Sequence, residues 1–186
     1  KKFSKSIMNA LRNLDEKTIS LFGVKPSRPD TGYGYIKYSA SKKGLDDLYP
    51  VESFIEKPDI HTAKKMVNMK KHFFWNAGIF LMSCDLWDKA IKSKDFTMHN
   101  LLFDSWSSRT EDVDFLRPNP QYFKKVEPNS IDYAVIEHSR KLGISLMVTE
   151  LKCEWSDLGT WDSLSNFYKD QENKKFSKGN VICSKL

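Results

Sequence analysis

The 186-residue chain is long enough to form one domain with a substantial core, and 40% of its residues are hydrophobic and 13% aromatic. This composition argues against an intrinsically disordered protein. No apolar run approaches the roughly 20 residues needed to cross a bilayer, and no secretory signal opens the chain. Because it begins Lys1-Lys2-Phe3 without a methionine, we expect it to be part of a longer protein.

The net charge of +6 comes mainly from lysines scattered along predicted helices. They form solvated faces on one interpretation and attract phosphorylated small molecules on another; nucleic acid is a lesser alternative. The three cysteines Cys84, Cys153 and Cys183 lie far apart without a C-x-x-C spacing, which indicates a reducing compartment and no zinc site. We therefore expect a cytoplasmic protein that binds neither membrane nor nucleic acid.

Hydrophobic spacing and turn residues divide the chain into alternating elements. Strands are predicted over residues 18–24, a short stretch ending near Tyr38, and residues 51–55, 73–82 and 142–151. Helices are predicted over residues 3–14, 60–71, the segment after Asp85, a patchy run over 96–122, residues 131–137 and the segment after Thr160. Asp59, Asp85, Asn129 and Thr160 are the expected N-caps. The alternation predicts an α/β fold, a three-layer and mostly parallel mixed sheet.

Polar residues end one of the predicted strands and interrupt another. Glu56 and Lys57 stand where Pro58 ends a strand, and Asn76 interrupts an apolar strand next to Gly78. Glu56 and Lys57 form an exposed ion pair of little energetic value on one interpretation and a ligand site on the other. Asn76 is either a residue of a strand bulge or a ligand-binding residue.

Asp157 lies in a turn between the predicted strand 142–151 and the helix after Thr160. Open α/β sheets bind their ligands at this end of a strand, and a carboxylate there suits a divalent cation. The alternative is that Asp157 only supports the turn by a side-chain bond to the backbone. The local pattern leaves both open.

Four phrases occur in order along the chain. They are Thr-Gly-Tyr-Gly-Tyr-Ile at 31–36, Phe-Ile-Glu-Lys-Pro at 54–58, Trp-Asn-Ala-Gly-Ile-Phe at 75–80 and Trp-Ser-Asp-Leu-Gly-Thr-Trp at 155–161. Together they resemble bacterial mannose-1-phosphate guanylyltransferases of the sugar-nucleotide pyrophosphorylase superfamily. The phrase Ser-Ile-Asp-Tyr-Ala-Val-Ile-Glu at 130–137 is similar to one typical of the mannose branch. Asp30 is a departure, because the family usually has Glu before Thr-Gly-Tyr-Gly.

The resemblance implies a Rossmann-like nucleotide-diphospho-sugar transferase fold. It also implies transfer from GTP to α-D-mannose 1-phosphate, which gives GDP-mannose and pyrophosphate. Asp157 would bind Mg²⁺, and Lys57 would bring a positive charge to the sugar side of the site, at the phosphate or at a nearby hydroxyl. Glu56 and Asn76 would bond sugar hydroxyls, and the backbone at Gly34 would lie against the sugar. Asp132 is either a substrate contact or only a first-turn helix carboxylate.

The family's glycine-rich nucleotide loop and its second metal-binding Asp have no match in residues 1–186. We therefore expect residues 1–178 to be the sugar-phosphate part of a nucleotidyltransferase domain, inactive by itself, and residues 179–186 to begin a further strand or linker. Alternatives are a pyrophosphorylase for another sugar or nucleotide, and a non-catalytic sugar-phosphate-binding module. A homo-oligomer and an additional isomerase domain in the parent protein stay open.

Overall fold

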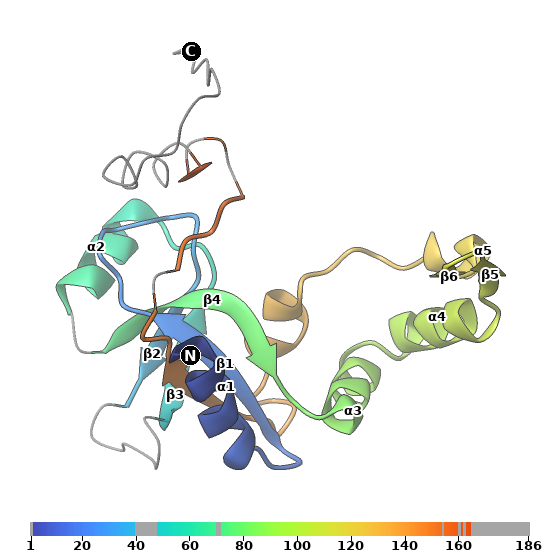
Figure 1. Ribbon diagram of the computed structural model, residues 1–186, viewed down its shortest axis with the longest axis horizontal. Coiled ribbons are helices and arrows are strands. Elements are labelled where there is room, and N and C mark those ends of the chain that lie inside the picture. The colour runs from blue at the N-terminus through green and yellow to red at the C-terminus, as the bar shows by residue number, and fades with distance from the viewer. Residues whose placement is uncertain are drawn as a thin grey trace. The chain divides into compact units, whose positions relative to one another are not determined.

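The computed structural model describes residues 2–39, 48–69, 72–153, 155–159, 161 and 163–164 (Figure 1). Its elements are α1 (Lys2–Arg12), β1 (Thr18–Val24), β2 (Tyr35–Tyr38), β3 (Leu48–Ile55), α2 (Ile60–Asn68), β4 (Phe73–Leu81), α3 (Cys84–Lys94), α4 (Phe96–Ser107), β5 (Thr110–Asp112), β6 (Phe115–Arg117), α5 (Pro120–Phe123), the π-helix η3 (Asp132–Ile136) and β7 (Ser145–Glu150). The predicted α/β class is confirmed.

The principal sheet has the strand order β1-β4-β2-β3-β7 and closes into a barrel, because β7 also pairs with β1. Only the β1–β7 pair is parallel among these described strands; the other pairs are antiparallel. The expectation of a mostly parallel mixed sheet was therefore wrong in strand direction for these described strands. Residues 39–47 are too few for a crossover helix, so β2 and β3 run in opposite directions. Helix α2 then connects β3 to β4, and these two strands flank β2 in the sheet.

Successive side chains of each strand point to opposite faces, so the sheet supports two apolar clusters. On one face, Tyr35 and Trp75 pack with Ala63 and Met66 of α2. The other face carries the larger cluster, in which Leu86, Ala90 and Ile91 of α3 and Ala134, Val135 and Ile136 of η3 cover Ile19, Leu21, Ile36 and Phe74 of the strands. Helix η3 is thereby fixed against the sheet by its buried side chains.

The predicted caps met different outcomes. Asp59 caps α2 as expected, and its Oδ1 accepts a hydrogen bond from Thr62 N at 2.9 Å. Asp85 was the wrong cap for α3: Ser83 caps it by accepting from Leu86 N, and Asp85 lies in the first turn. Asn129 does not cap the following helix either, since Ser130 Oγ accepts from Tyr133 N at 3.4 Å. Thr160 lies outside the described residues.

The predicted helical run over 96–122 is helix α4, the β5–β6 hairpin and the short helix α5. Ser105 on α4 is buried and binds Asn119 in both directions: its Oγ donates to Asn119 O at 3.0 Å, and Asn119 N donates to Ser105 O at 2.9 Å. The expectation that Pro118 and Pro120 interrupt a helix was wrong: α4 already ends at Ser107, Pro118 follows β6, and Pro120 is the first residue of α5, a position that suits proline.

The chain divides into two compact units, residues 1–153 and 154–186, and all the strands above belong to the first. The proposed segment at 179–186 lies outside the described residues. No helix within the described ranges is long and apolar enough to cross a membrane.

Gly23 of β1 lies close against Phe74 of β4. A Cβ added there would lie 2.5 Å from Phe74 Cβ and 2.8 Å from Phe74 Cγ. Because such overpacking commonly costs about 1–3 kcal/mol, Gly23→Ala should lower the free energy of unfolding by about that amount in urea denaturation. Gly143→Asn is the matched control, since Gly143 has φ +68° with open space around it and Asn tolerates that conformation. Equal denaturation midpoints for Gly23→Ala and wild type would contradict the close approach.

Candidate functional site

Strand register brings three of the predicted site residues together. Tyr35 on β2 is opposite Ile55 of β3 and Trp75 of β4. All these pairs are antiparallel, so the residue before Tyr35, Gly34, lies between Glu56 and Asn76. The backbone confirms this position, because Asn76 N donates to Gly34 O at 2.7 Å.

Gly34 is required by the side chains around it. A Cβ at this position would collide with Glu56 Oε2, and it would lie 3.1 Å from Phe54 Cζ and 3.3 Å from Asn76 Cβ. The missing side chain therefore makes room for the Glu56 carboxylate. The sequence predicted that the backbone at Gly34 lies against a sugar; the structure adds that Glu56 occupies the space beside it.

Glu56 presents a buried acceptor. Its side chain is only 12% exposed, and within the described part of the chain its Oε2 is buried without a hydrogen-bond partner. Oε1 lies 3.9 Å from Lys57 Nζ, a distant ion pair with a largely exposed lysine. An unpaired buried acceptor is costly in a native protein and commonly marks a place where a ligand or water completes the bonding.

Asn76 is buried and held at both ends of its amide. Its Nδ2 donates to Asp132 Oδ1 at 3.1 Å, and its Oδ1 accepts from Gly78 N at 3.1 Å. The β1–β4 register shifts at this point, and Gly78 has φ +67°. Asn76 is therefore at a strand irregularity, as one interpretation predicted, and it also faces the polar cluster. Gly78 is favoured here by its left-handed backbone, since a Cβ added at this position would meet open space.

Asp132 belongs to the same cluster but comes from helix η3 and not from a strand. It is the first residue of η3, whose buried residues Ala134, Val135 and Ile136 pack on the same sheet face from which Asn76 projects. Asp132 is half-buried and bonded to Asn76. A carboxylate that only complemented a helix dipole would need no such partner.

Burial changes the pKa of both carboxyl groups in this cluster. The pKa of Glu56 is raised above its usual range, first by burial and next by the negative charge of Asp132, while Lys57 opposes the shift. Burial also raises the pKa of Asp132, and its backbone bond and the bond from Asn76 oppose this. The cluster thus holds carboxylates that are poorly solvated.

Lys57 is exposed and has φ +45°, a left-handed conformation that costs a non-glycine residue about 1–2 kcal/mol. Such strain is found preferentially at functional sites. The conformation turns the chain directly after Glu56, before Pro58.

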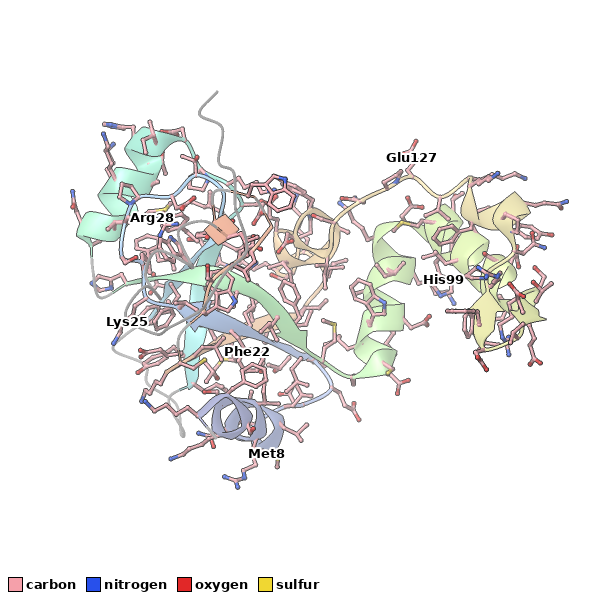
Figure 2. The ribbon with its side chains drawn as sticks, turned by 45° about the horizontal axis from the view of Figure 1, so that its top comes forward. Met8, Phe22, Lys25, Arg28, His99 and Glu127 are labelled. Carbon is pink, nitrogen blue, oxygen red and sulfur yellow. The ribbon has the colours of Figure 1, made fainter. Side chains whose placement is uncertain are left out.

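Sequence reasoning missed Arg28, which Figure 2 labels together with Lys25. Arg28 Nη2 pairs with Asp30 Oδ2 at 2.7 Å, and its Cζ lies 5.4 Å from the centroid of the Trp75 ring. Asp30 Oδ1 also accepts from Gly32 N at 2.9 Å. Arg28 and Asp30 therefore hold the segment that leads into Gly34. The sequence feature that could have indicated this is an arginine two residues before an aspartate.

Asp157 is not among the residues brought together in the first unit, since it belongs to the second. It is exposed, and its Oδ1 accepts from Gly159 N at 3.1 Å. This is the turn-supporting bond of the alternative interpretation. It leaves acceptor capacity on the carboxylate, because an ionised carboxyl group offers about four lone-pair sites. Across the described residues, no three His, Cys, Asp or Glu side chains gather as a metal site.

A cavity of about 490 Å³ lies elsewhere, between β3, β7 and η3. Glu137, Ser139 and Arg140 are among the residues lining it, but Gly34, Glu56, Asn76 and Asp132 are not. Arg140 Nη2 donates to Glu52 O at 2.5 Å across this region. We place the candidate site at the polar cluster around Gly34, because a buried carboxylate oxygen without a partner, Glu56 Oε2, lies there beside Asn76 and Asp132.

Comparison with known proteins agrees with the resemblance. A mannose-1-phosphate guanylyltransferase from Salmonella muenchen is 31% identical over 183 residues, which cover 98% of this chain and 37% of that protein. The alginate biosynthesis protein AlgA of Pseudomonas aeruginosa is 30% identical over 97% of this chain and 36% of its own length. A crystal structure described as mannose-1-phosphate geranyltransferase from Thermus thermophilus has the same fold. Its TM-score is 0.73 at 22% identity, and the match covers 90% of this chain and 45% of that one.

The chain thus spans little more than a third of the length of these curated relatives. The profile of the nucleotidyl transferase family matches residues 2–174. The resemblance predicted from the four phrases is confirmed, and the chain belongs to the nucleotidyl transferase family.

Proposed function

We propose that this chain forms the sugar-phosphate side of a mannose-1-phosphate guanylyltransferase. The observation that carries the proposal is the buried, unpaired Oε2 of Glu56 beside Asn76 and Gly34. It lies in a chain whose relatives include proteins named for this activity. The substrates would be GTP and α-D-mannose 1-phosphate, and the products GDP-mannose and pyrophosphate.

In the proposed reaction, a phosphate oxygen of mannose 1-phosphate attacks the α-phosphorus of GTP. A new phosphorus–oxygen bond forms, the bond between the α-phosphorus and the bridging oxygen breaks, and pyrophosphate leaves. No covalent enzyme intermediate is required, so the protein contributes position and charge.

Glu56 and Asn76 are suited to hold the sugar. Glu56 Oε2 can accept a bond from a hydroxyl group, and Asn76 has a second N–H beyond the one given to Asp132. A sugar without a matching hydroxyl would leave these buried groups unpaired, which supports discrimination between sugars. Lys57, exposed next to Glu56, would offset the negative charge of the sugar phosphate.

Asp157 is the residue of this chain that would bind Mg²⁺. This ion prefers oxygen ligands and commonly takes one or two carboxylates together with substrate phosphates and waters, so a single exposed carboxylate fits it. When bound, the ion would supply charge neutralisation to the phosphates.

Glu56→Gln should weaken the binding of mannose 1-phosphate to the 186-residue chain, measured by isothermal titration calorimetry. The neutral side chain replaces a strong acceptor, and such buried bonds are commonly worth about 1–3 kcal/mol. Glu111→Gln, a change of an exposed carboxylate in β5, is the control. Unaltered affinity in Glu56→Gln would refute the sugar assignment, and absence of binding by the wild-type chain would refute the proposed function.

The same variant should be more stable than wild type at pH 7. The folded-state pKa of Glu56 is raised above the usual value of 4.5, so the folded protein holds this proton more tightly than the unfolded chain does. The resulting gain in folding stability is fully present below pH 4.5. It is lost as pH rises through the folded-state pKa. Thermal melts should show Glu56→Gln above wild type at neutral pH, with the difference vanishing below pH 4.5. A variant that melts lower than wild type at pH 7 would contradict the burial argument.

Lys57→Gly should separate charge from backbone conformation. Glycine accepts φ +45° without strain, so the melting temperature should be unchanged or slightly higher. Affinity for mannose 1-phosphate should fall and become less dependent on salt, since a cation facing a phosphate is lost. Lys64→Gly, an exposed change on α2, should instead lower the melting temperature and leave affinity unaltered. Full affinity with the original salt dependence in Lys57→Gly would exclude Lys57 from the phosphate site.

Asp157→Asn tests the metal assignment in the enzyme that contains this chain. Asparagine can make the same bond to Gly159 N, so the thermal melt should be unchanged. Turnover should fall by orders of magnitude and recover in part with Mn²⁺, which accepts neutral ligands more readily. Asp114→Asn, in the turn between β5 and β6, is the control. Near wild-type turnover at every Mg²⁺ concentration would leave Asp157 a turn residue only.

A further inference from the structure

The amide of Asn76 can adopt only one orientation in this site. Its nitrogen faces the Asp132 carboxylate at 3.1 Å and its oxygen faces the N–H of Gly78 at 3.1 Å. The reverse orientation would set two acceptors against each other at Asp132 and two donors against each other at Gly78. Asn76 is only 9% exposed, so water cannot readily relieve such a mismatch.

Asp132 is itself held in place. The three residues Ala134, Val135 and Ile136 of its π-helix are buried against the sheet, which fixes the backbone from which Asp132 projects. Single π-helical turns are rare and are often found at functional sites. The hydrogen bond that Asn76 donates to Asp132 therefore connects β4 with η3, two elements that are each held by their own buried residues.

The bonds that are already made define which groups are left for a ligand. Asn76 retains one N–H, and Glu56 Oε2 is an acceptor without a partner in the described part of the chain. Both side chains border the space where a Gly34 Cβ would be. One hydroxyl group can accept from that N–H and donate to that carboxylate. An anionic group can accept but not donate, and it would face the charges of Glu56 and Asp132.

We infer that Asp132 is a positioning residue that fixes the Asn76 amide, so that Asn76 and Glu56 together select a neutral, hydroxyl-bearing sugar and reject one with an anionic group on that face. The inference rests on the proposed function and specifies its substrate class. In this inference Asp132 acts by orienting Asn76. The sequence had left two other interpretations open, a direct contact with the substrate and a carboxylate that only complements the helix dipole.

The first test follows the Asn76 side chain by nuclear magnetic resonance of the ¹⁵N-labelled 186-residue chain. In wild type the two Nδ2 protons should be well separated in chemical shift, because one is bonded to a carboxylate, and their shifts should follow the titration of Asp132. Asp132→Ala should bring them together, while Asp132→Asn keeps an acceptor and should largely preserve the separation. Glu137→Gln, five residues further along, changes a nearby carboxylate that does not bond Asn76 and should leave the separation unaltered.

The second test measures ligand affinity of the same variants by calorimetry. Asp132→Ala should weaken mannose 1-phosphate binding about tenfold or more, and Asp132→Asn by less. Wild type should prefer mannose 1-phosphate to mannuronic acid 1-phosphate, and removal of the Asp132 charge should narrow this preference. Thermal melts of all three variants establish that they are folded.

The possible results separate the two proposals. If wild type binds mannose 1-phosphate while Asp132→Ala has unaltered affinity and unaltered Asn76 resonances, the inference fails and the proposed function stands. If the resonances change but mannuronic acid 1-phosphate binds as tightly as mannose 1-phosphate, the substrate-class part is overturned. If wild type binds no sugar phosphate, the proposed function is refuted, and the inferred selection between sugars is refuted as well.

Discussion

The site depends on the antiparallel pairing of β2 with β3 on one side and with β4 on the other. This pairing puts Gly34 between Glu56 and Asn76, three residues that are far apart in the sequence. A register shift of one residue would turn the side chains of Glu56 and Asn76 to the opposite face, toward α2 and away from η3. The apolar clusters on both faces oppose such a shift, because it would exchange Tyr35 and Trp75 with Ile36 and Phe74. Core packing therefore fixes the geometry of the polar cluster.

The candidate site keeps an arrangement that a protein selected only for stability would avoid. Glu56 is buried with an unpaired oxygen, and Lys57 beside it has a left-handed backbone. Unpaired polar groups and strained backbone both lower stability and are characteristic of binding sites. Stable secondary structure on either side holds Glu56 and Lys57 in this conformation. It consists of the strand pairing of β3 and the capped helix α2 that follows Pro58.

Much of this arrangement could be predicted from the sequence, and the failures have physical causes. β1 was predicted with its observed bounds, because residues 18–24 are β-rich and end in turn residues. Gly34, Glu56 and Asn76 were singled out from short phrases, and the structure brings them together, while their role in binding stays a prediction. Strand direction failed because periodicity carries no information on how strands connect. The bond between Asp132 and Asn76 could not be predicted, since it depends on where a π-helix packs. Asp157 stays a prediction, because it lies in the second unit.

The parallel pairing of β1 with β7 has a consequence for how the polypeptide reaches this fold. Thr18 pairs with Ser145 and Gly23 with Glu150, so the first strand acquires one of its two neighbours from the far end of the first unit. Contacts of such large sequence separation form late, since a long loop must close before they give any stabilisation. During synthesis on the ribosome, one edge of β1 stays unpaired until residues 145–150 have been synthesised. Six of its seven residues are buried in the final fold, so before that pairing forms β1 is an exposed apolar strand that is prone to aggregation.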